Sequence, residues 1–312
     1  MNFLVCSKIS IPAKDRTLPA WEYLRAKGHT VIVEHPGNAV VMANKPDAII
    51  SMGVSIMEET FLALKQFPGV PLYAYNWDIY AWIWEKGQEG KVQAQHASRP
   101  REYDYVRYGE LLKQAREVWV PSRCTGLRTE QWYGLKNWSV ILSACPWWDW
   151  KHVSDEGYVL CCLREIPDPY WGRLERVCGE LDIPLHMPKH ELTYEGYIRE
   201  VARCRFLVSD LYELSTGGLS LLEGYYHGKP VLLSDSPWHG GRDYFGDRAL
   251  YFRHDDESHL KTQLMRLWRY QETSAQLGFG SFAPPDHKEW ITTNYSDQRM
   301  VDDMLRRIAA TT

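Results

Sequence analysis

The chain has 312 residues, a length that accommodates roughly two α/β domains, each with its own hydrophobic core. Its 45% hydrophobic and 24% charged residues are ordinary for a globular protein. The net charge of −4, from 36 Lys and Arg against 40 Asp and Glu, gives no global basic character. This argues against a dedicated nucleic-acid-binding protein.

Cysteine usage and hydropathy indicate the compartment. Seven cysteines are scattered without a C-x-x-C motif, and Cys161 and Cys162 fall inside an apolar run. This pattern favours buried thiols in a reducing cytosol over disulfides or a zinc site. The N-terminal sequence turns polar too early for a signal peptide, and no window approaches the about 18 apolar residues of a membrane span. We therefore expect a cytoplasmic protein without a membrane span or a bound metal.

The first half of the sequence alternates strand-like and helix-like segments with short connections, which predicts a parallel sheet. The expected strands are residues 2–6, 29–34, 46–51, 70–76, 117–120 and 139–142. The expected helices are residues 18–27, 58–67, 110–114 and 124–133. Residues 146–150, Pro-Trp-Trp-Asp-Trp, form the expected linker to a second domain.

Residues 77–108 depart from this alternation, because they are rich in aromatic residues and arginine around a polar middle. The segment is either an acceptor-binding loop or an irregular surface insertion. Its candidate acceptor contacts are Trp77, Arg99, Arg101 and Tyr103. Asp78, just after the fourth strand, is a candidate for orienting an acceptor or handling its proton. It could equally be the N-cap of a helix over residues 79–84.

A second alternation of strands and helices follows the linker. The expected strands are residues 158–162, 184–187, 205–209, 231–233 and 250–252. The expected helices are residues 170–181, 194–204, 219–227 and 259–270, with a last helix after Ser296 as its N-cap. We predict an α/β protein with two tandem Rossmann-like domains, residues 1–148 and 149–312, and a cleft between them. The C-terminal helix can pack back on the first domain.

Residues 215–234 contain the main candidate for a ligand site. They open with two hydroxyl residues and two glycines, Ser215, Thr216, Gly217 and Gly218. A glycine pair before a helix leaves backbone N–H groups at the positive end of the helix dipole, which suits a phosphate or diphosphate. An ordinary helix start in an α/β protein fits the same residues.

Two Rossmann-like halves with an anion-binding helix in the second resemble the GT-B fold of glycosyltransferases, in particular the retaining family 4. The most specific match is residues 221–231 (LLEGYYHGKPV), which resemble the family's L-L-E-A-M-A-x-G-x-P-V. Residues 240–243 (GGRD) resemble the G-G-x-x-E that follows it. Residues 24–31 and 115–122 resemble two segments of the family's first domain, and Arg164 matches the arginine of its G-R pair.

The resemblance implies a nucleotide-sugar donor, UDP- or GDP-linked, and no cofactor. Arg164 would contact the diphosphate. The backbone N–H groups of Gly217, Gly218 and Leu219 would bind phosphate. The carboxylate of Glu223 would accept hydrogen bonds from the ribose hydroxyls. The structural alternatives are a surface salt bridge for Arg164 and a dipole-favouring acid at the helix start for Glu223.

The sequence departs from the family pattern at three places. The family's first glutamate, eight positions before the second, falls at Ser215. Either Glu213 keeps its role across an insertion or Ser215 replaces it. The family's lysine falls at Pro169, and a lysine-containing segment replaces the glycine-rich loop after the first strand. The missing charge would come from Lys8, Lys14, Arg173 or Lys189.

The resemblance implies transfer of a sugar with retention and without metal to a hydroxyl acceptor such as a glycan, a lipid-linked sugar or a small compound. One alternative is a phage-type DNA glycosyltransferase acting on a hydroxymethylated base, for which the arginines and tyrosines of residues 99–108 would suit backbone charge and stacking. The net charge argues against nucleic acid. Another is a nucleotide-sugar epimerase or a non-catalytic GT-B binding module. The sequence makes no prediction of the oligomeric state.

Overall fold

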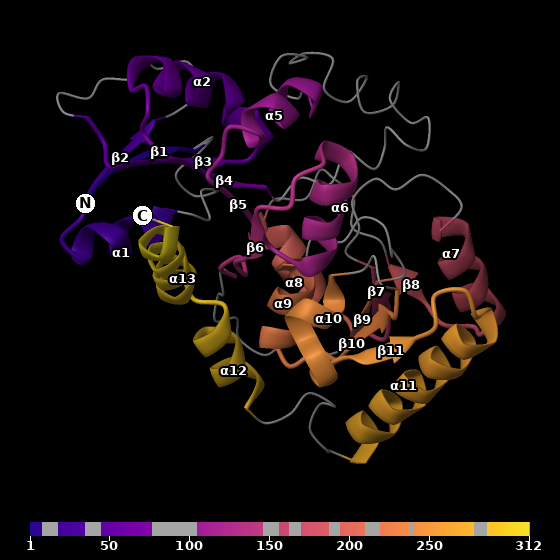
Figure 1. Cartoon of the computed structure of the whole chain (residues 1–312). Helices are drawn as coiled ribbons and strands as arrows, with labels where there is room; N and C mark the ends of the chain where they lie inside the picture. The colour runs from indigo at the N-terminus through magenta and orange to yellow at the C-terminus, as the bar shows by residue number, and fades with distance from the viewer. Residues whose placement is uncertain are drawn as a thin grey trace. The chain divides into compact units, whose positions relative to one another are not determined.

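The structure is a computed structural model that describes residues 1–7, 18–34, 45–76, 105–145, 156–161, 170–186, 194–209, 219–236, 240–277 and 286–311. The chain forms two compact units (Figure 1). Unit 1 comprises Met1–Ala144 and Asp297–Thr312, and unit 2 comprises Cys145–Ser296. The sequence-based boundary falls after residue 148, and the helix that follows Ser296 belongs to unit 1.

Unit 1 is built on a parallel six-stranded sheet in the order β2-β1-β3-β4-β5-β6. Its strands are β1 (Asn2–Cys6), β2 (Thr30–Glu34), β3 (Ala48–Met52), β4 (Leu72–Tyr75), β5 (Glu117–Val120) and β6 (Trp138–Val140). Its helices are α1 (Leu18–Ala26), α2 (Met57–Gln66), α5 (Tyr105–Leu112), α6 (Arg123–Tyr133) and α13 (Asp297–Thr311), with a 3-10 turn at Val54–Ile56. The strands are apolar almost throughout because helices cover both faces.

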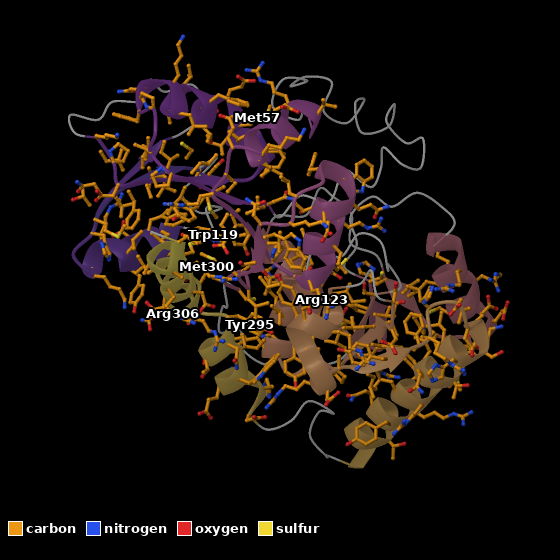
Figure 2. The ribbon with its side chains drawn as sticks, viewed as in Figure 1. Met57, Trp119, Arg123, Tyr295, Met300 and Arg306 are labelled. Carbon is orange, nitrogen blue, oxygen red and sulfur yellow. The ribbon has the colours of Figure 1, made fainter. Side chains whose placement is uncertain are left out.

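The helices α1 and α13 cover one face of this sheet, although they come from opposite ends of the chain (Figure 1). Trp119 of β5 and Met300 of α13 belong to the same buried cluster (Figure 2). Glu117, buried in β5, accepts hydrogen bonds from Trp119 and Ser139 and pairs with Arg307 of α13 at 3.6 Å. The last helix is therefore part of the core of unit 1.

Unit 2 contains a parallel five-stranded sheet in the order β11-β10-β9-β7-β8. Its strands are β7 (Val159–Leu160), β8 (Leu185–His186), β9 (Phe206–Ser209), β10 (Val231–Ser234) and β11 (Leu250–Phe252). Its helices are α7 (Tyr170–Glu180), α8 (Tyr194–Arg203), α9 (Leu219–Tyr226), α10 (Gly241–Phe245), α11 (Glu257–Leu277) and α12 (His287–Asn294), with a 3-10 turn at Gly246–Arg248.

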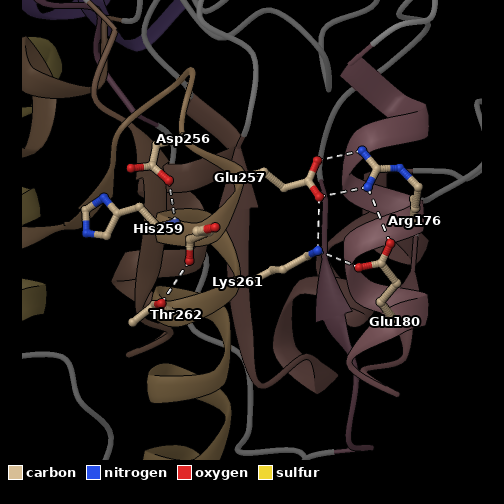
Figure 3. A network of polar contacts seen from close by, with 8 residues as sticks. Arg176, Glu180, Asp256, Glu257, His259, Lys261 and Thr262 are labelled. Atoms are coloured by element: carbon tan, nitrogen blue, oxygen red, sulfur yellow. Dashed lines mark hydrogen bonds and ion pairs between the residues drawn. The ribbon is translucent and has the colours of Figure 1, made fainter.

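The helices α7 and α11 pack together on one face of the unit 2 sheet around Leu174, Leu260 and Leu264. Outside this apolar contact, four charged side chains of the two helices form an ion-pair network (Figure 3). The network consists of Arg176, Glu180, Glu257 and Lys261. The other face of the sheet receives α9, as the contact of its Gly224 with β9 shows.

The prediction of two α/β halves with parallel sheets is confirmed. The helix α5 begins at Tyr105, five residues before the expected start, because Tyr108 continues the buried face of Leu111 and Leu112 by one turn. The short helices α10 and α12 were not expected. The sequence of α12 has only one buried residue, Ile291, so its helical period is weak.

Other expectations concern thiols and membranes. The six cysteines within the described residues are all buried thiols, as expected. They are Cys6, Cys124, Cys145, Cys161, Cys178 and Cys204. No helix among the described segments is both long and apolar enough to span a bilayer.

Candidate functional site

Each sheet has one place where the strand order reverses, and open α/β sheets bind ligands outside the carboxyl ends of the strands there. In unit 2 this place lies between β7 and β9, where Leu160 pairs with Leu207. The buried residues Cys161 and Ser209 follow or end these two strands. In sequence, Cys161 leads into residues 162–169 and Ser209 into residues 210–218, so both candidate donor segments are attached at this edge.

Many of the predicted site residues lie outside the described residues. They are Trp77, Asp78, Arg99, Arg101, Tyr103, Arg164, Lys189, Glu213, Ser215, Thr216, Gly217 and Gly218, together with Lys8 and Lys14. Leu219 is the first residue of α9, as expected for a helix that begins after the glycine pair. These assignments remain predictions, and Glu223 is the candidate donor-site residue whose side chain the structure describes.

Glu223 lies in the middle of α9 with an exposed fraction of 2%. Its neighbours along the helix, Leu222 and Tyr225, are buried as well. A carboxylate is seldom placed in such surroundings unless polar groups meet it there, because loss of hydration disfavours the charge. The burial of Glu223 therefore argues against a solvent-exposed acid that serves only the helix dipole.

A glycine determines how closely the helix of Glu223 approaches the sheet. A Cβ atom on Gly224 would lie 2.3 Å from Cδ1 of Leu207 in β9. Any larger residue there would require the Leu207 side chain or α9 to shift. The sequence comparison placed this glycine where the family has alanine, but its packing role appears only in the structure.

Aromatic residues of α10 and α12 pack against α9 around Tyr225. The ring of Tyr225 is fully buried and lies edge-on to Phe245 of α10 at 5.6 Å and to Trp290 of α12 at 5.5 Å. Arg248 stacks on Trp290 at 4.9 Å and donates two hydrogen bonds to Asp286, at 2.9 and 2.7 Å. Burial raises the pKa of Tyr225. These contacts give Glu223 a rigid support.

Two arginines near the carboxyl edge of the unit 2 sheet are engaged within the fold. Arg242, in the GGRD segment, donates from Nε to Asp235 at 3.0 Å and lies 3.8 Å above the ring of Tyr251. Asp235 raises the pKa of Arg242 further above its usual range. Arg173, a candidate for the missing charge, donates to the backbone carbonyl of His254.

Unit 1 presents a different set of groups at the carboxyl edge of its sheet. Several uncharged polar side chains are buried there: Ser7, Asn76, Ser122, Thr125, Thr129 and Ser143. Tyr75 donates to the carbonyl of Ile141 at 2.6 Å and lies 2.9 Å from Oγ of Ser143. Burial raises the pKa of Tyr75, so its hydroxyl stays neutral. Sequence reasoning missed this cluster because serine, threonine and asparagine after a strand are also common turn residues.

A glycine also ends β3 at the reversal point of the unit 1 sheet, beside β1. Gly53 has φ 88° and ψ 176°, a backbone conformation that is essentially restricted to glycine. It turns the chain directly from the strand into the 3-10 turn that precedes α2. Within the described part of the chain, no three His, Cys, Asp or Glu side chains gather in a metal-binding cluster.

Comparison with known proteins gives the fold an independent basis. No family model matches the sequence, and no curated protein matches it. Sucrose-phosphate synthase from Thermosynechococcus elongatus aligns over 100% of both chains with a TM-score of 0.60 and 14% identity. HepE from Anabaena, crystallised with UDP and glucose, aligns over 99% of this chain and 100% of its own, with a TM-score of 0.60 and 12% identity.

A third similar structure is the lipopolysaccharide outer core galactosyltransferase WaaB, with a TM-score of 0.60 and 10% identity over 100% of both chains. At such identities the similarity establishes architecture. The chain has the two-domain GT-B fold of glycosyltransferases, as the sequence motifs predict.

Proposed function

We propose that this protein is a glycosyltransferase that moves a sugar from a nucleotide-diphosphate donor to a hydroxyl acceptor. The observation that carries the proposal is the buried carboxylate of Glu223, on the helix that follows β9 at the strand-order reversal of a GT-B sheet. The crystal structures of HepE with UDP and with UDP-glucose support a UDP-linked donor for this fold.

In the proposed donor site, Glu223 accepts hydrogen bonds from the two ribose hydroxyls, which a carboxylate does through its two oxygens. The backbone N–H groups of Gly217, Gly218 and Leu219 receive phosphate at the start of α9. Arg164 and Lys189, with Ser215 and Thr216, complete the contacts to the diphosphate and the sugar. Glu213 is the proposed contact to the donor sugar in place of the family's first glutamate.

The proposed reaction is transfer with retention. The bond between the sugar C1 and the diphosphate oxygen breaks, and the acceptor oxygen attacks C1 from the same face. The acceptor proton passes to the leaving phosphate oxygen. Arginine and lysine stabilise the charge that develops on the leaving diphosphate. We propose that they do so without a metal, and a rate that is unchanged by EDTA would agree with this.

The proposed acceptor is a glycan, a lipid-linked sugar or another hydroxyl compound, held by unit 1. Its proposed contacts are Trp77, Arg99, Arg101 and Tyr103, with Asp78 orienting the reacting hydroxyl. The uncharged polar groups at the carboxyl edge of the unit 1 sheet support a polar acceptor without a required charge.

A panel of UDP-, GDP- and ADP-sugars tests the proposal, with release of the nucleotide as the readout. We expect one donor to be turned over slowly with water and faster with a hydroxyl acceptor. Tight nucleotide binding without turnover of any donor would indicate a binding module instead. Conversion of a UDP-sugar into its epimer without an acceptor would indicate an epimerase, and salt-sensitive binding of duplex DNA would indicate the DNA-modifying class.

A further inference from the structure

The side chain of Asn76 lies directly after β4, at the carboxyl edge of the unit 1 sheet, with an exposed fraction of 2%. Its backbone N–H donates to the carbonyl oxygen of Trp119 at 2.7 Å, so the ladder between β4 and β5 continues through this residue. The ladder places the side chain on the face of the sheet that α6 covers, where its amide meets Thr129.

A chain of buried hydrogen bonds fixes the orientation of this amide. Nδ2 of Asn76 donates to Oγ1 of Thr129 at 2.9 Å, and Oγ1 of Thr129 donates to the carbonyl oxygen of Thr125 at 2.8 Å. A hydroxyl has one proton to donate, and Thr129 uses it on Thr125. The atom of Asn76 that faces Thr129 therefore has to be the nitrogen. The carbonyl oxygen Oδ1 faces away from it.

This oxygen has no role within the described fold. Oδ1 of Asn76 is buried and accepts no hydrogen bond from any residue that the structure describes. A buried acceptor without a donor is unfavourable because it has lost its hydration, and native proteins keep few such atoms. Among the residues that the structure describes, the fold uses only the nitrogen, which leaves the oxygen available to a group outside them.

We infer that Oδ1 of Asn76 accepts a hydrogen bond from a hydroxyl of a sugar acceptor and thereby positions that acceptor on unit 1. The inference rests on the proposed glycosyl transfer, and the carboxyl edge of an open α/β sheet is where a ligand is expected. An amide oxygen is neutral and only accepts, so it selects a hydroxyl over an ether oxygen or a carboxylate. Because Oδ1 is covered in the structure, binding of the sugar requires a local rearrangement that exposes it.

Binding of simple sugars to the full chain tests this without requiring turnover. The probes are the methyl glycosides of glucose, galactose, mannose and N-acetylglucosamine, measured by saturation-transfer NMR with and without UDP. We expect the wild type to bind at least one of them, and Asn76→Leu to bind it at least about tenfold more weakly, as loss of one hydrogen bond to a buried polar group implies.

Two further measurements separate substrate contact from a structural role. Thr129→Val removes the anchor of Nδ2 but keeps the accepting oxygen, so we expect it to lower the melting temperature without abolishing sugar binding. Among monodeoxy analogues of the bound glycoside, one should bind the wild type about tenfold more weakly than the parent sugar does. The same analogue and the parent sugar should bind Asn76→Leu with equal affinity. Asn76→Ser replaces Asn76→Leu in both assays if the leucine variant does not fold.

Equal affinity of the Asn76 variant and the wild type for every glycoside would overturn the inference. Failure of the wild type to bind any of the four sugars would overturn it as well. The proposed glycosyl transfer fails by a separate result, which is the absence of nucleotide release from every donor in the panel.

Discussion

In unit 1, α6 brings Thr129 against the amide of Asn76, whereas in unit 2 α9 brings the carboxylate of Glu223 into the interior. Both helices approach their sheets through a glycine next to the polar residue. A Cβ on Gly126 would lie 2.4 Å from the indole of Trp138, and one on Gly224 would lie 2.3 Å from Leu207. The same packing device thus supports uncharged groups in one unit and an acid in the other.

This difference in chemistry corresponds to the two substrates of the proposed reaction. Neutral amide and hydroxyl groups distinguish hydrogen-bond donors from acceptors without requiring charge on the ligand. A carboxylate held in a site of low polarity makes stronger hydrogen bonds to vicinal hydroxyls, such as those of a ribose. The following predictions, in order of decreasing effect, test whether unit 2 binds the donor and unit 1 binds the acceptor.

The largest effect is expected from Glu223→Gln. The change keeps the size of the side chain but removes the charge, so donor turnover should fall about 100-fold or more while the melting temperature stays within a few degrees. Nucleotide release at saturating donor measures it, with the exposed Glu289→Gln as the control. Full activity of Glu223→Gln would show that the carboxylate of Glu223 has no role in donor turnover.

The close packing at the two glycines is tested by Gly224→Ala and Gly126→Ala. Each added methyl group has to displace a packed side chain, so each variant should lose about 1–3 kcal/mol of unfolding free energy. Gly179→Ala in α7 is the matched control, because its Cβ would have no atom within 4 Å, and it should be neutral or stabilised by up to about 1 kcal/mol. Denaturant unfolding measures all three.

The outcome of the glycine variants also sharpens the comparison between units. Gly224→Ala should impair donor turnover because it displaces the helix of Glu223. Gly126→Ala should instead weaken sugar binding, since it disturbs the packing of α6 against Trp138 and α6 carries Thr129, which holds the amide of Asn76. If both variants changed donor turnover and sugar binding equally, the carboxyl edges of the two sheets would not have separate roles.

The helices α13 and α11 each begin with an acid, and the surroundings shift the pKa values of these two acids in opposite directions. Burial raises the pKa of Asp297, at the start of α13, to about 6. Between its ordinary value of 3.8 and about 6 the folded state holds the extra proton, so this group makes unit 1 less stable as the pH rises through that range. After allowance for partial exposure, Asp297→Asn should raise the melting temperature at pH 7.5 by about 2–4 °C.

The gain of Asp297→Asn should shrink towards zero at pH 4, where the folded wild type already carries the proton. Thermal unfolding at the two pH values measures the difference. A gain that is the same at both values would show that the effect is not the titration of this carboxyl.

Glu257, at the start of α11 in unit 2, has the reverse behaviour and the smallest expected effect. Arg176 and then Lys261 lower its pKa to about 2 (Figure 3). Its contribution is present above about pH 4.5 and is lost as the pH falls towards 2. The network is exposed, so Glu257→Gln should lower the melting temperature by only about 1–2 °C, and less in high salt. A loss that is insensitive to salt would point to packing instead.

Local sequence predicted a large part of this protein. Short apolar runs and period-3.6 patterns predicted every strand and most helices of the described residues, because buried parallel strands and amphipathic helices leave strong local patterns. The GT-B fold followed from the two alternations and the motif around Glu223. The same motif selected Glu223 itself, which the structure places in the interior.

Only the tertiary structure determined the rest, because the relevant contacts join residues far apart in the chain. The sequence allowed α13 to pack back on the first domain, and the structure shows the contacts that hold it there, such as Arg307 with Glu117, which lies 190 residues earlier. The short α12 is held by Tyr225 and Arg248, which its own sequence does not reveal. The orientation of the Asn76 amide depends on Thr129 of α6, 53 residues later in the chain. Hydrophobic periodicity specifies which face of an element is buried, whereas packing partners and hydrogen-bond direction are set when the elements meet.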